Sequence, residues 1–333
     1  MSTEVNPTIV LDMIESFRRS KAMFAGCELR IFDHLEQQPA TLAQLAKTIS
    51  ADLTNLERLL DALVGLGLLT KSEGVYSNTT EASTYLVRDS PRTMTGYILY
   101  SNSVLWKLWD NLEGAVLEGS HRWKQTFGLD GPLFSSFFST EESMRTFIAG
   151  MHGFGVISSP SVVAAFDLSK YKQLVDLGGA TGHLPIAAAA KYPQMEAVVF
   201  DLPNVVKVAA EHCAGTRVKC VAGDFFTDEL PAADLYALGR ILHDWSEPKI
   251  ALLLKKIVAA LPEGGGLLIA EKLLNDDKTK PVSATMQSLN MMICTEGRER
   301  SLAEYEALCL AAGFKRVEGR RTGQPVDAIL AVK

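Results

Sequence analysis

A histidine and two glutamates in the second half of the chain have the chemistry of an assisted general base. His243 follows one predicted strand, Glu271 ends the next, and Glu299 stands just before a predicted helix. An imidazole, with a reference pKa of about 6.5, can take a proton from a hydroxyl group near neutral pH. A carboxylate on its far nitrogen would fix the tautomer and stabilise the imidazolium. Because Ser301-Leu-Ala-Glu304 is itself a capping box, Glu299 is not needed to start that helix.

His243 and its neighbour Asp244 also have plainer interpretations. His243 alone could be an ordinary loop histidine. Asp244, with Glu247 three positions on, could cap the helix that runs through Lys255. The shared sheet edge of His243 and the two glutamates is what favours a catalytic role, because ligands of open α/β sheets bind at the carboxyl ends of the strands.

The segment Gln173–Gly182 predicts which ligand lies beside this histidine. Its apolar start is typical of a buried parallel strand, and an Ala-rich helix is predicted from His183 to Tyr192. Between them stands Asp176-x-Gly178-x-Ala180-x-Gly182, a loop whose glycines let a ligand approach the backbone closely. It does not fill the dinucleotide fingerprint Gly-x-Gly-x-x-Gly. An acid at the strand end suits a ligand that carries an amino group and no phosphate.

A second acid supports S-adenosylmethionine (SAM) as this ligand. Asp201 ends the run Ala197–Asp201, 201 − 176 = 25 positions after Asp176, where a carboxylate can accept both ribose hydroxyls. In Gly223-Asp-Phe-Phe226, Asp224 can accept from an adenine amine while Phe225 flanks the ring. SAM is therefore favoured over NAD, and an α/β domain without a cofactor is the remaining alternative.

The second half of the chain predicts a doubly wound α/β sheet. Five strands alternate with helices and a closing hairpin follows, which matches the seven-stranded sheet of SAM-dependent methyltransferases. The predicted strands are Leu174–Asp176, Ala197–Asp201, Val218–Ala222, Leu235–Leu238, Leu267–Glu271, Lys315–Arg321 and Asp327–Val332.

The first half predicts helices followed by a winged helix. Two helices broken around Gly26 cover residues 8–36, and helix, turn, helix and hairpin then follow from Thr41 to Ser77. The segment from Thr41 to Thr80 contains three basic and four acidic residues, and two of the acids, Glu57 and Asp61, lie on the second predicted helix. Because phosphate would repel that helix, a dimerisation module is favoured over a DNA reader.

Composition excludes several other classes of protein. A net charge of −6 opposes a nucleic-acid or anionic-membrane surface, and no apolar run is expected to reach the length of a membrane span. The five cysteines are scattered and never form Cys-x-x-Cys, which is typical of reduced thiols in a cytoplasmic protein. The aromatic residues from Tyr97 to Phe138 are expected in core or interface packing, although Trp123 and Phe127 could wall a substrate pocket.

Taken together, several segments resemble the acetylserotonin (hydroxyindole) O-methyltransferase family, and within it the acetylserotonin O-methyltransferase-like proteins. The resemblance covers nearly the whole chain. It rests on Lys21-Ala-Met-Phe-Ala-Gly-Cys-Glu-Leu, Asp176-Leu-Gly-Gly, Phe200-Asp-Leu-Pro, Gly223-Asp-Phe-Phe, Arg240-Ile-Leu-His-Asp-Trp, Ser288-Leu-Asn-Met, Thr295-Glu-Gly-Arg-Glu-Arg and Asp327-Ala-Ile-Leu.

The resemblance implies roles for single residues. His243 would be the catalytic base, flanked by Glu271 and Glu299. Cofactor binding would fall to Phe138, Asp176, Gly178, Asp201, Gly223, Asp224, Phe225 and Arg240, and acceptor binding to Asp244, Asn290 and Cys294. Phe138 stands where the indole enzyme has a tyrosine, Gly155 where it has a tryptophan, and Cys294 where it has a substrate-binding glutamine. These departures leave the identity of the acceptor open.

The sequence thus predicts an α/β SAM-dependent O-methyltransferase that acts on a small, aromatic hydroxyl without a metal. We expect a dimerisation domain at 1–100, a helical linker that contributes to the substrate pocket at 101–166, and the SAM-binding catalytic domain at 167–333. We also expect a cytoplasmic homodimer. Two alternatives are a methyltransferase-like binding protein without catalysis and a winged-helix regulator that senses a metabolite.

Overall fold

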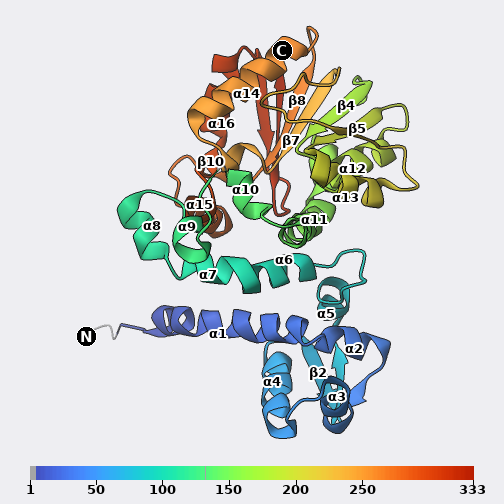
Figure 1. The fold of residues 1–333 in the computed structure, drawn as a ribbon, viewed down its shortest axis with the longest axis vertical. Helices are drawn as coiled ribbons and strands as arrows, with labels where there is room; N and C mark the ends of the chain where they lie inside the picture. The colour runs from blue at the N-terminus through green and yellow to red at the C-terminus, as the bar shows by residue number, and fades with distance from the viewer. Residues whose placement is uncertain (1–4, 132) are drawn as a thin grey trace. The chain divides into compact units, whose positions relative to one another are not determined.

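The computed structural model describes residues 5–131 and 133–333, and the chain divides after Leu105 into two compact units. The first unit is mainly helical and carries a small three-stranded sheet (Figure 1). Its elements are α1 (Thr8–Glu28), α2 (Ile31–Gln37), β1 (Ala40–Thr41), α3 (Leu42–Ile49), α4 (Leu53–Gly65), β2 (Leu69–Ser72), β3 (Val75–Asn78), α5 (Thr80–Tyr85), α6 (Thr95–Tyr100) and the π-helix η1 (Ser101–Leu105).

Local sequence explains the order helix, helix, hairpin in this unit. A capping box formed by Thr41 and Gln44 starts α3, and the side chain of Asp52 accepts a hydrogen bond from the backbone N–H of Asn55 to start α4. Glu73 and Gly74 both have positive φ, as a tight antiparallel hairpin between β2 and β3 requires. The order of elements predicted from Thr41 to Ser77 is therefore present.

The two helices predicted over residues 8–36 are present, but their break lies after Glu28 and not around Gly26. Helix α1 runs through Gly26 to Glu28, and the chain turns at Arg30, which has a left-handed φ of 58°. Gly26 has a different role, because a Cβ at this position would lie 2.9 Å from Cε2 of Phe32 and 3.2 Å from Cδ1 of Leu63. The glycine lets the helices pack closely, and it does not end the helix.

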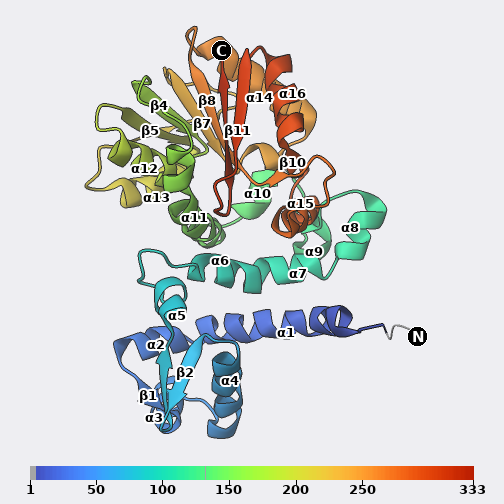
Figure 2. The ribbon, with the colours of Figure 1, turned by 180° about the vertical axis from the view of Figure 1, so that it is seen from behind.

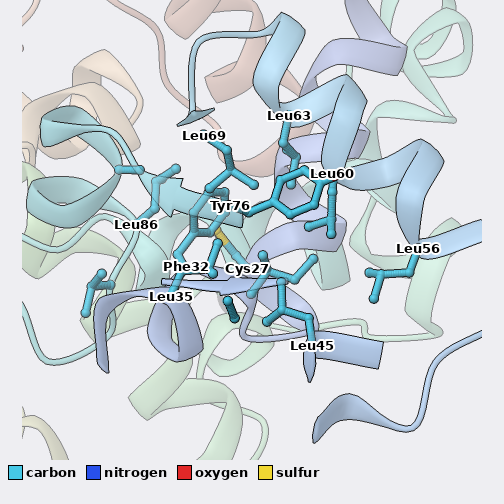
Figure 3. Packing of buried hydrophobic residues seen from close by; sticks show 14 of the residues in the cluster. Cys27, Phe32, Leu35, Leu45, Leu56, Leu60, Leu63, Leu69, Tyr76 and Leu86 are labelled. Carbon is cyan, nitrogen blue, oxygen red and sulfur yellow. The ribbon is translucent and has the colours of Figure 1, made fainter. Parts of the chain in front are cut away.

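The core of the first unit is aliphatic and includes one buried phenol (Figure 3). Phe32, Leu60, Leu63 and Tyr76 are fully buried in it. The hydroxyl of Tyr76 donates to Oδ1 of Asp61 at 2.8 Å, and Lys71 Nζ donates to the same oxygen. Asp61, one of the acids that opposed a DNA-binding interpretation of α4, therefore ties that helix to the hairpin.

The second unit contains a seven-stranded sheet with helices on both faces (Figures 1 and 2). Its first part is helical: α7 (Trp106–Trp109), α8 (Leu112–Glu118), α9 (Trp123–Phe127), α10 (Leu133–Phe137) and α11 (Glu141–Ala164). The sheet and its helices follow: β4 (Gln173–Leu177), α12 (His183–Lys191), β5 (Glu196–Asp201), α13 (Pro203–Cys213), β6 (Lys219–Ala222), β7 (Leu235–Gly239), the 3₁₀ helix η2 (Leu242–Asp244), α14 (Glu247–Ala260), β8 (Gly266–Glu271), β9 (Leu273–Leu274), α15 (Val282–Cys294), β10 (Arg300–Ser301), α16 (Leu302–Ala312), β11 (Arg316–Arg320) and β12 (Asp327–Val332).

The strand order is β11-β12-β8-β7-β4-β5-β6, and the five strands from β4 to β8 are parallel. Strand β12 pairs antiparallel with β8, and β11 pairs antiparallel with β12. The predicted seven-stranded sheet with its closing hairpin is therefore confirmed. A short parallel pair between β9 and β10 was not predicted. This pair joins the segment after Glu271 to the segment after Glu299.

Helix α11 is long and apolar enough to cross a membrane by length and composition alone, which the sequence analysis overlooked. Val162 and Val163 near its end are fully buried, in a cluster with Leu174 of β4 and Leu184 of α12. The end of the helix therefore packs as part of the sheet's own core.

Two glycine substitutions test the packing of the first unit. Gly26→Ala should lower the free energy of unfolding by about 1–3 kcal/mol, because the new methyl group meets a fully buried Phe32. Gly65→Ala, in α4 with no atom within 4 Å of its added Cβ, should raise stability by up to about 1 kcal/mol. Urea unfolding of both variants measures this, and a stabilised Gly26→Ala would contradict the packing argument.

Candidate functional site

The predicted site residues converge at the carboxyl edge of the second unit's sheet. Asp176 lies in β4, Asp201 ends β5, Arg240 follows β7 and Glu271 ends β8. Strands β4 and β7 are neighbours, although the chain visits β5 and β6 between them. This reversal of strand order opens a crevice at the edge, which is where open α/β sheets bind ligands.

His243 is held by two carboxylates on one side of its ring. Nδ1 lies 2.7 Å from Oε1 of Glu299 and 3.3 Å from Oε2 of Glu271. The histidine is 3% exposed, and both glutamates are fully buried. Nε2 points the other way, 3.6 Å from Oδ1 of Asp244. Because the carboxylates occupy Nδ1, Nε2 is the nitrogen that remains for a ligand.

Glu271 has a second task that the sequence did not predict. Its Oε1 accepts hydrogen bonds from the backbone N–H groups of Ile241, Leu242 and His243, at 3.0, 2.9 and 3.4 Å. These are the free amides at the start of η2. The glutamate therefore caps the turn that carries the histidine, from a neighbouring strand.

Arg300 and Gly297 also fix the position of the histidine and were not predicted to do so. Arg300 is 1% exposed, and its guanidinium donates to the carbonyl oxygens of Leu242 and Trp245 on either side of His243. A Cβ on Gly297 would lie 2.1 Å from the carbonyl oxygen of His243. Both residues lie in the segment Thr295-Glu-Gly-Arg-Glu-Arg, within two positions of Glu299. Their closeness to a predicted catalytic acid is the sequence feature that could have indicated their role.

Burial and charge set the protonation of this group. Burial alone would lower the pKa of His243, but Glu271, Glu299 and Asp244 together raise it to about 9. Burial raises the pKa of the Glu271 carboxyl, against the lowering effect of the histidine. Burial also raises the pKa of Asp244, to about 6. These acids therefore favour the imidazolium form of His243 at neutral pH in the protein without a cofactor.

The same three side chains could in principle bind a metal ion. One ligand atom each from His243, Glu271 and Glu299 lies within 4.8 Å of the others. Oε1 of each glutamate is already engaged, by Nδ1 of His243 at 2.7 Å for Glu299 and by three backbone amides for Glu271. The Oε2 atoms of both glutamates are buried without a hydrogen-bond partner among the described residues.

Asp176 has the features of a partner for a cationic ligand. The residue is 2% exposed, and its Oδ1 has no hydrogen-bond partner among the described residues. Burial raises its pKa to about 7, and the charge of Asp201 adds to this. A buried carboxylate without a partner is unfavourable unless a cation neutralises it. The amino group of SAM fits this requirement.

The loop after β4 brings two predicted cofactor-binding residues together. Gly178, Ala180 and Gly182 all have positive φ, which alanine adopts only with strain. A Cβ on Gly178 would lie 2.6 Å from Cδ1 of Ile241 and 3.4 Å from the ring of Phe225. The residues predicted to face the cofactor at Gly178 and Phe225 are therefore neighbours.

Asp201 and Asp224 are oriented by backbone amides. Asp201 accepts from the N–H groups of Ala180 and Leu202, at 2.9 and 2.7 Å, and Asp224 accepts from Phe226 N–H at 2.8 Å. Each oxygen can accept a second hydrogen bond, as a ribose or an adenine amine requires. Gly223 has a packing reason instead, because its Cβ would lie 2.3 Å from the ring of Phe200.

Arg240 and Phe138 lie at the two ends of this region. Arg240 is a second strained residue, with φ of 58°, and its guanidinium stacks over the ring of Phe154 at 5.0 Å. Phe138 packs with Leu202, the residue after Asp201, in a cluster with Val205 of α13. Their contact with a cofactor stays a prediction.

The three predicted acceptor residues lie near His243 or near one another. Asn290 Oδ1 accepts from the indole N–H of Trp109 at 2.8 Å and from the thiol of Cys294 at 3.8 Å. Cys294 is 2% exposed, and the charge of Asp244 adds to the burial that raises its thiol pKa. The helix-cap interpretation of Asp244 is wrong, because α14 begins after Ser246.

The linker aromatics mainly support α15. Trp123 is 3% exposed, and its indole N–H donates to the carbonyl oxygen of Cys294 at 2.8 Å. Its ring packs against Phe127 and Phe137, with centroids 5.7 and 4.7 Å away. Packing therefore explains Trp123, and the structure gives it no pocket-lining role.

A cavity of about 840 Å³ lies along α15 and reaches Glu299. Ser288, Leu289 and Met292 line it, whereas Asn290 and Cys294 do not. Glu299, which is hydrogen-bonded to His243, is thus also among the residues that line this cavity.

Comparison with known proteins gives one consistent family. Residues 109–315 match the model of the O-methyltransferase domain, and residues 11–88 match the O-methyltransferase dimerisation domain. The chain is 40% identical to chicken acetylserotonin O-methyltransferase, over 98% of this chain and 97% of that protein.

Two human proteins are similar as well. The probable bifunctional dTTP/UTP pyrophosphatase/methyltransferase protein is 39% identical over 98% of this chain, which spans only 54% of that protein. The crystal structure of human N-acetylserotonin methyltransferase in complex with SAM is 36% identical, with a TM-score of 0.95 over 100% of this chain and 99% of that one.

Replacing Asp176 tests whether its buried carboxylate lacks a neutralising cation in the protein without cofactor. Because its folded pKa of about 7 lies above the ordinary aspartate value of 3.8, the protein loses stability as pH rises between these values. Asp176→Asn should therefore melt several degrees above the wild type at pH 8 and at the same temperature near pH 4. It should also bind S-adenosylhomocysteine more weakly.

Asp167→Asn is the matched control. Asp167 is exposed, and hydrogen bonds from Ser169 lower its pKa, so its removal should not stabilise the protein at pH 8. Scanning calorimetry measures both variants. An Asp176→Asn protein that melts below the wild type at pH 8 would show that the carboxylate is already neutralised.

Proposed function

The chain belongs to the O-methyltransferase family that includes the acetylserotonin O-methyltransferases, and from this premise we propose that His243 is the general base of a methyl transfer to an aromatic hydroxyl. Family membership makes the chain a SAM-dependent O-methyltransferase. The observation that carries the finer proposal is the hydrogen bond from Nδ1 to Glu299, which leaves Nε2 for the acceptor.

In the proposed reaction, the acceptor hydroxyl gives its proton to Nε2 of His243 as its oxygen takes the methyl group. SAM supplies that methyl group on a sulfonium, which leaves as the neutral thioether. Glu299 and Glu271 stabilise the imidazolium that forms. Asp244, near Nε2, can orient the hydroxyl, and Asp176 and Asp201 hold the amino and ribose groups of the cofactor.

Charge explains how a histidine with a pKa of about 9 can be a base near neutral pH. The three acids around it favour the imidazolium in the free protein. A sulfonium brought beside Nε2 opposes them, because like charges disfavour protonation. We therefore expect the cofactor to prepare the base by lowering its pKa.

The same family premise and the surface of the first unit support a homodimer. Ile9, Leu11, Ile14 and Phe17 of α1 are each more than half exposed, and they lie in or beside the matched dimerisation domain. A cytoplasmic location stays part of the proposal. A methyltransferase-like protein without catalysis is less well supported, because the whole hydrogen-bonded group around His243 is present.

The pH dependence of turnover tests the base. The acid limb of kcat/KM, which reports the free enzyme, should lie near pH 9, and that of kcat should lie lower. His243→Ala should lower kcat by roughly 10²–10⁴ and leave binding of S-adenosylhomocysteine nearly unchanged. Glu299→Gln should keep more activity and move the acid limb of kcat/KM to lower pH, since one acid is lost.

Steady-state kinetics from pH 6 to about 10, with a phenol or hydroxyindole that the enzyme methylates, give these values. Near-wild-type turnover of His243→Ala with the same acid limb would assign the base to another group.

A further inference from the structure

Two cations lie at the carboxyl edge without an acid bound to them. Arg240 follows β7, and Lys272 follows Glu271 at the end of β8. Both stand over the ring of Phe154, at 5.0 Å for the guanidinium carbon and 5.9 Å for the ammonium nitrogen. Among the described residues neither side chain has an ion pair or a hydrogen bond, and Arg240 Nε is buried without a partner.

Such an arrangement is unfavourable in the protein alone. Burial lowers the pKa of Lys272 to about 8, and the charge of Arg240 adds to this. Arg240 also has its strained backbone. Two cations that repel one another at a partly buried edge indicate a site for anions.

The surroundings of the two cations differ. The charge of Arg240 acts on His183, at the start of the helix after the glycine loop, and also on Asp244 and Glu271. Arg240 follows β7, the neighbour of β4 and its glycine loop, and can take the carboxylate of SAM there. Lys272 follows β8, one strand further from β4, and comes directly after Glu271, whose Oε2 lies 3.3 Å from Nδ1 of His243.

Lys272 therefore lies on the side of the base, where the acceptor must be. We propose that the ammonium of Lys272 binds a carboxylate of the methyl acceptor, so that the acceptor is a hydroxylated aromatic acid. This inference rests on the proposed function, because it needs the acceptor beside His243. An acidic acceptor would neutralise this ammonium, which has no ion pair among the described residues.

Calorimetric titration tests the inference without turnover. The protein is loaded with S-adenosylhomocysteine and titrated with three acids and their methyl esters: 5-hydroxyindole-3-acetic, 4-hydroxyphenylacetic and 4-hydroxycinnamic acid. The wild type should bind at least one acid about tenfold more tightly than its ester. Lys272→Met should lose this preference, and Lys272→Arg should retain it.

Lys191→Met is the matched control. Lys191 also stands over an aromatic ring, that of Tyr192 at 5.5 Å, but it lies in the last turn of α12, away from the carboxyl edge. Its removal changes the net charge equally and should leave the preference for the acid unchanged. The melting temperature of Lys272→Met should be no lower than that of the wild type, since a partly buried charge is removed.

Three results would overturn the inference. The wild type could bind no acid more tightly than its ester, or Lys272→Met could keep the preference. Lys272→Met could instead weaken S-adenosylhomocysteine alone, which would assign the ammonium to the cofactor's carboxylate. Binding of the acid without methylation of it would leave the carboxylate site standing and refute the proposed function.

Discussion

The rest of the site depends on the burial of Glu271 beside His243. A fully buried carboxylate is unfavourable unless hydrogen bonds and an opposite charge compensate for the lost water. Glu271 obtains both from one turn, through the backbone amides of η2 and the imidazole that this turn carries. The same contacts that compensate the buried charge of Glu271 therefore also hold the imidazole of His243 in place. Glu299 then determines which nitrogen of the ring bears the proton.

This constraint also separates two sides of the site. Acids gather around Nδ1, where the imidazolium is stabilised, and Nε2 faces Asp244 and the open edge. Across the edge, Asp176 lacks a cation, while Arg240 and Lys272 lack an anion. A zwitterionic cofactor and an acidic acceptor would supply the missing charges in complementary positions. The protein alone holds these charges at a cost in stability.

Much of the fold and part of the site could be predicted from the sequence. Apolar runs ending in Asp201 and Glu271 placed the strands to within about two residues, because parallel strands are buried on both faces. The grouping of His243 with both glutamates followed from the shared sheet edge. The end of α1 could not be predicted, because packing against Phe32 decides the role of Gly26. Arg300 and the capping by Glu271 depend on contacts between distant segments, which no local pattern contains.

The central claim is that neutral His243 carries its proton on Nδ1 and presents a bare Nε2 to the acceptor. Nitrogen-15 NMR of the labelled imidazole, recorded above pH 10 with S-adenosylhomocysteine bound, measures this tautomer directly because the pKa of His243 is about 9. We expect an Nδ1–H resonance coupled to the hydrogen bond with Glu299, and an unprotonated Nε2. A protonated Nε2 with a bare Nδ1 would contradict it.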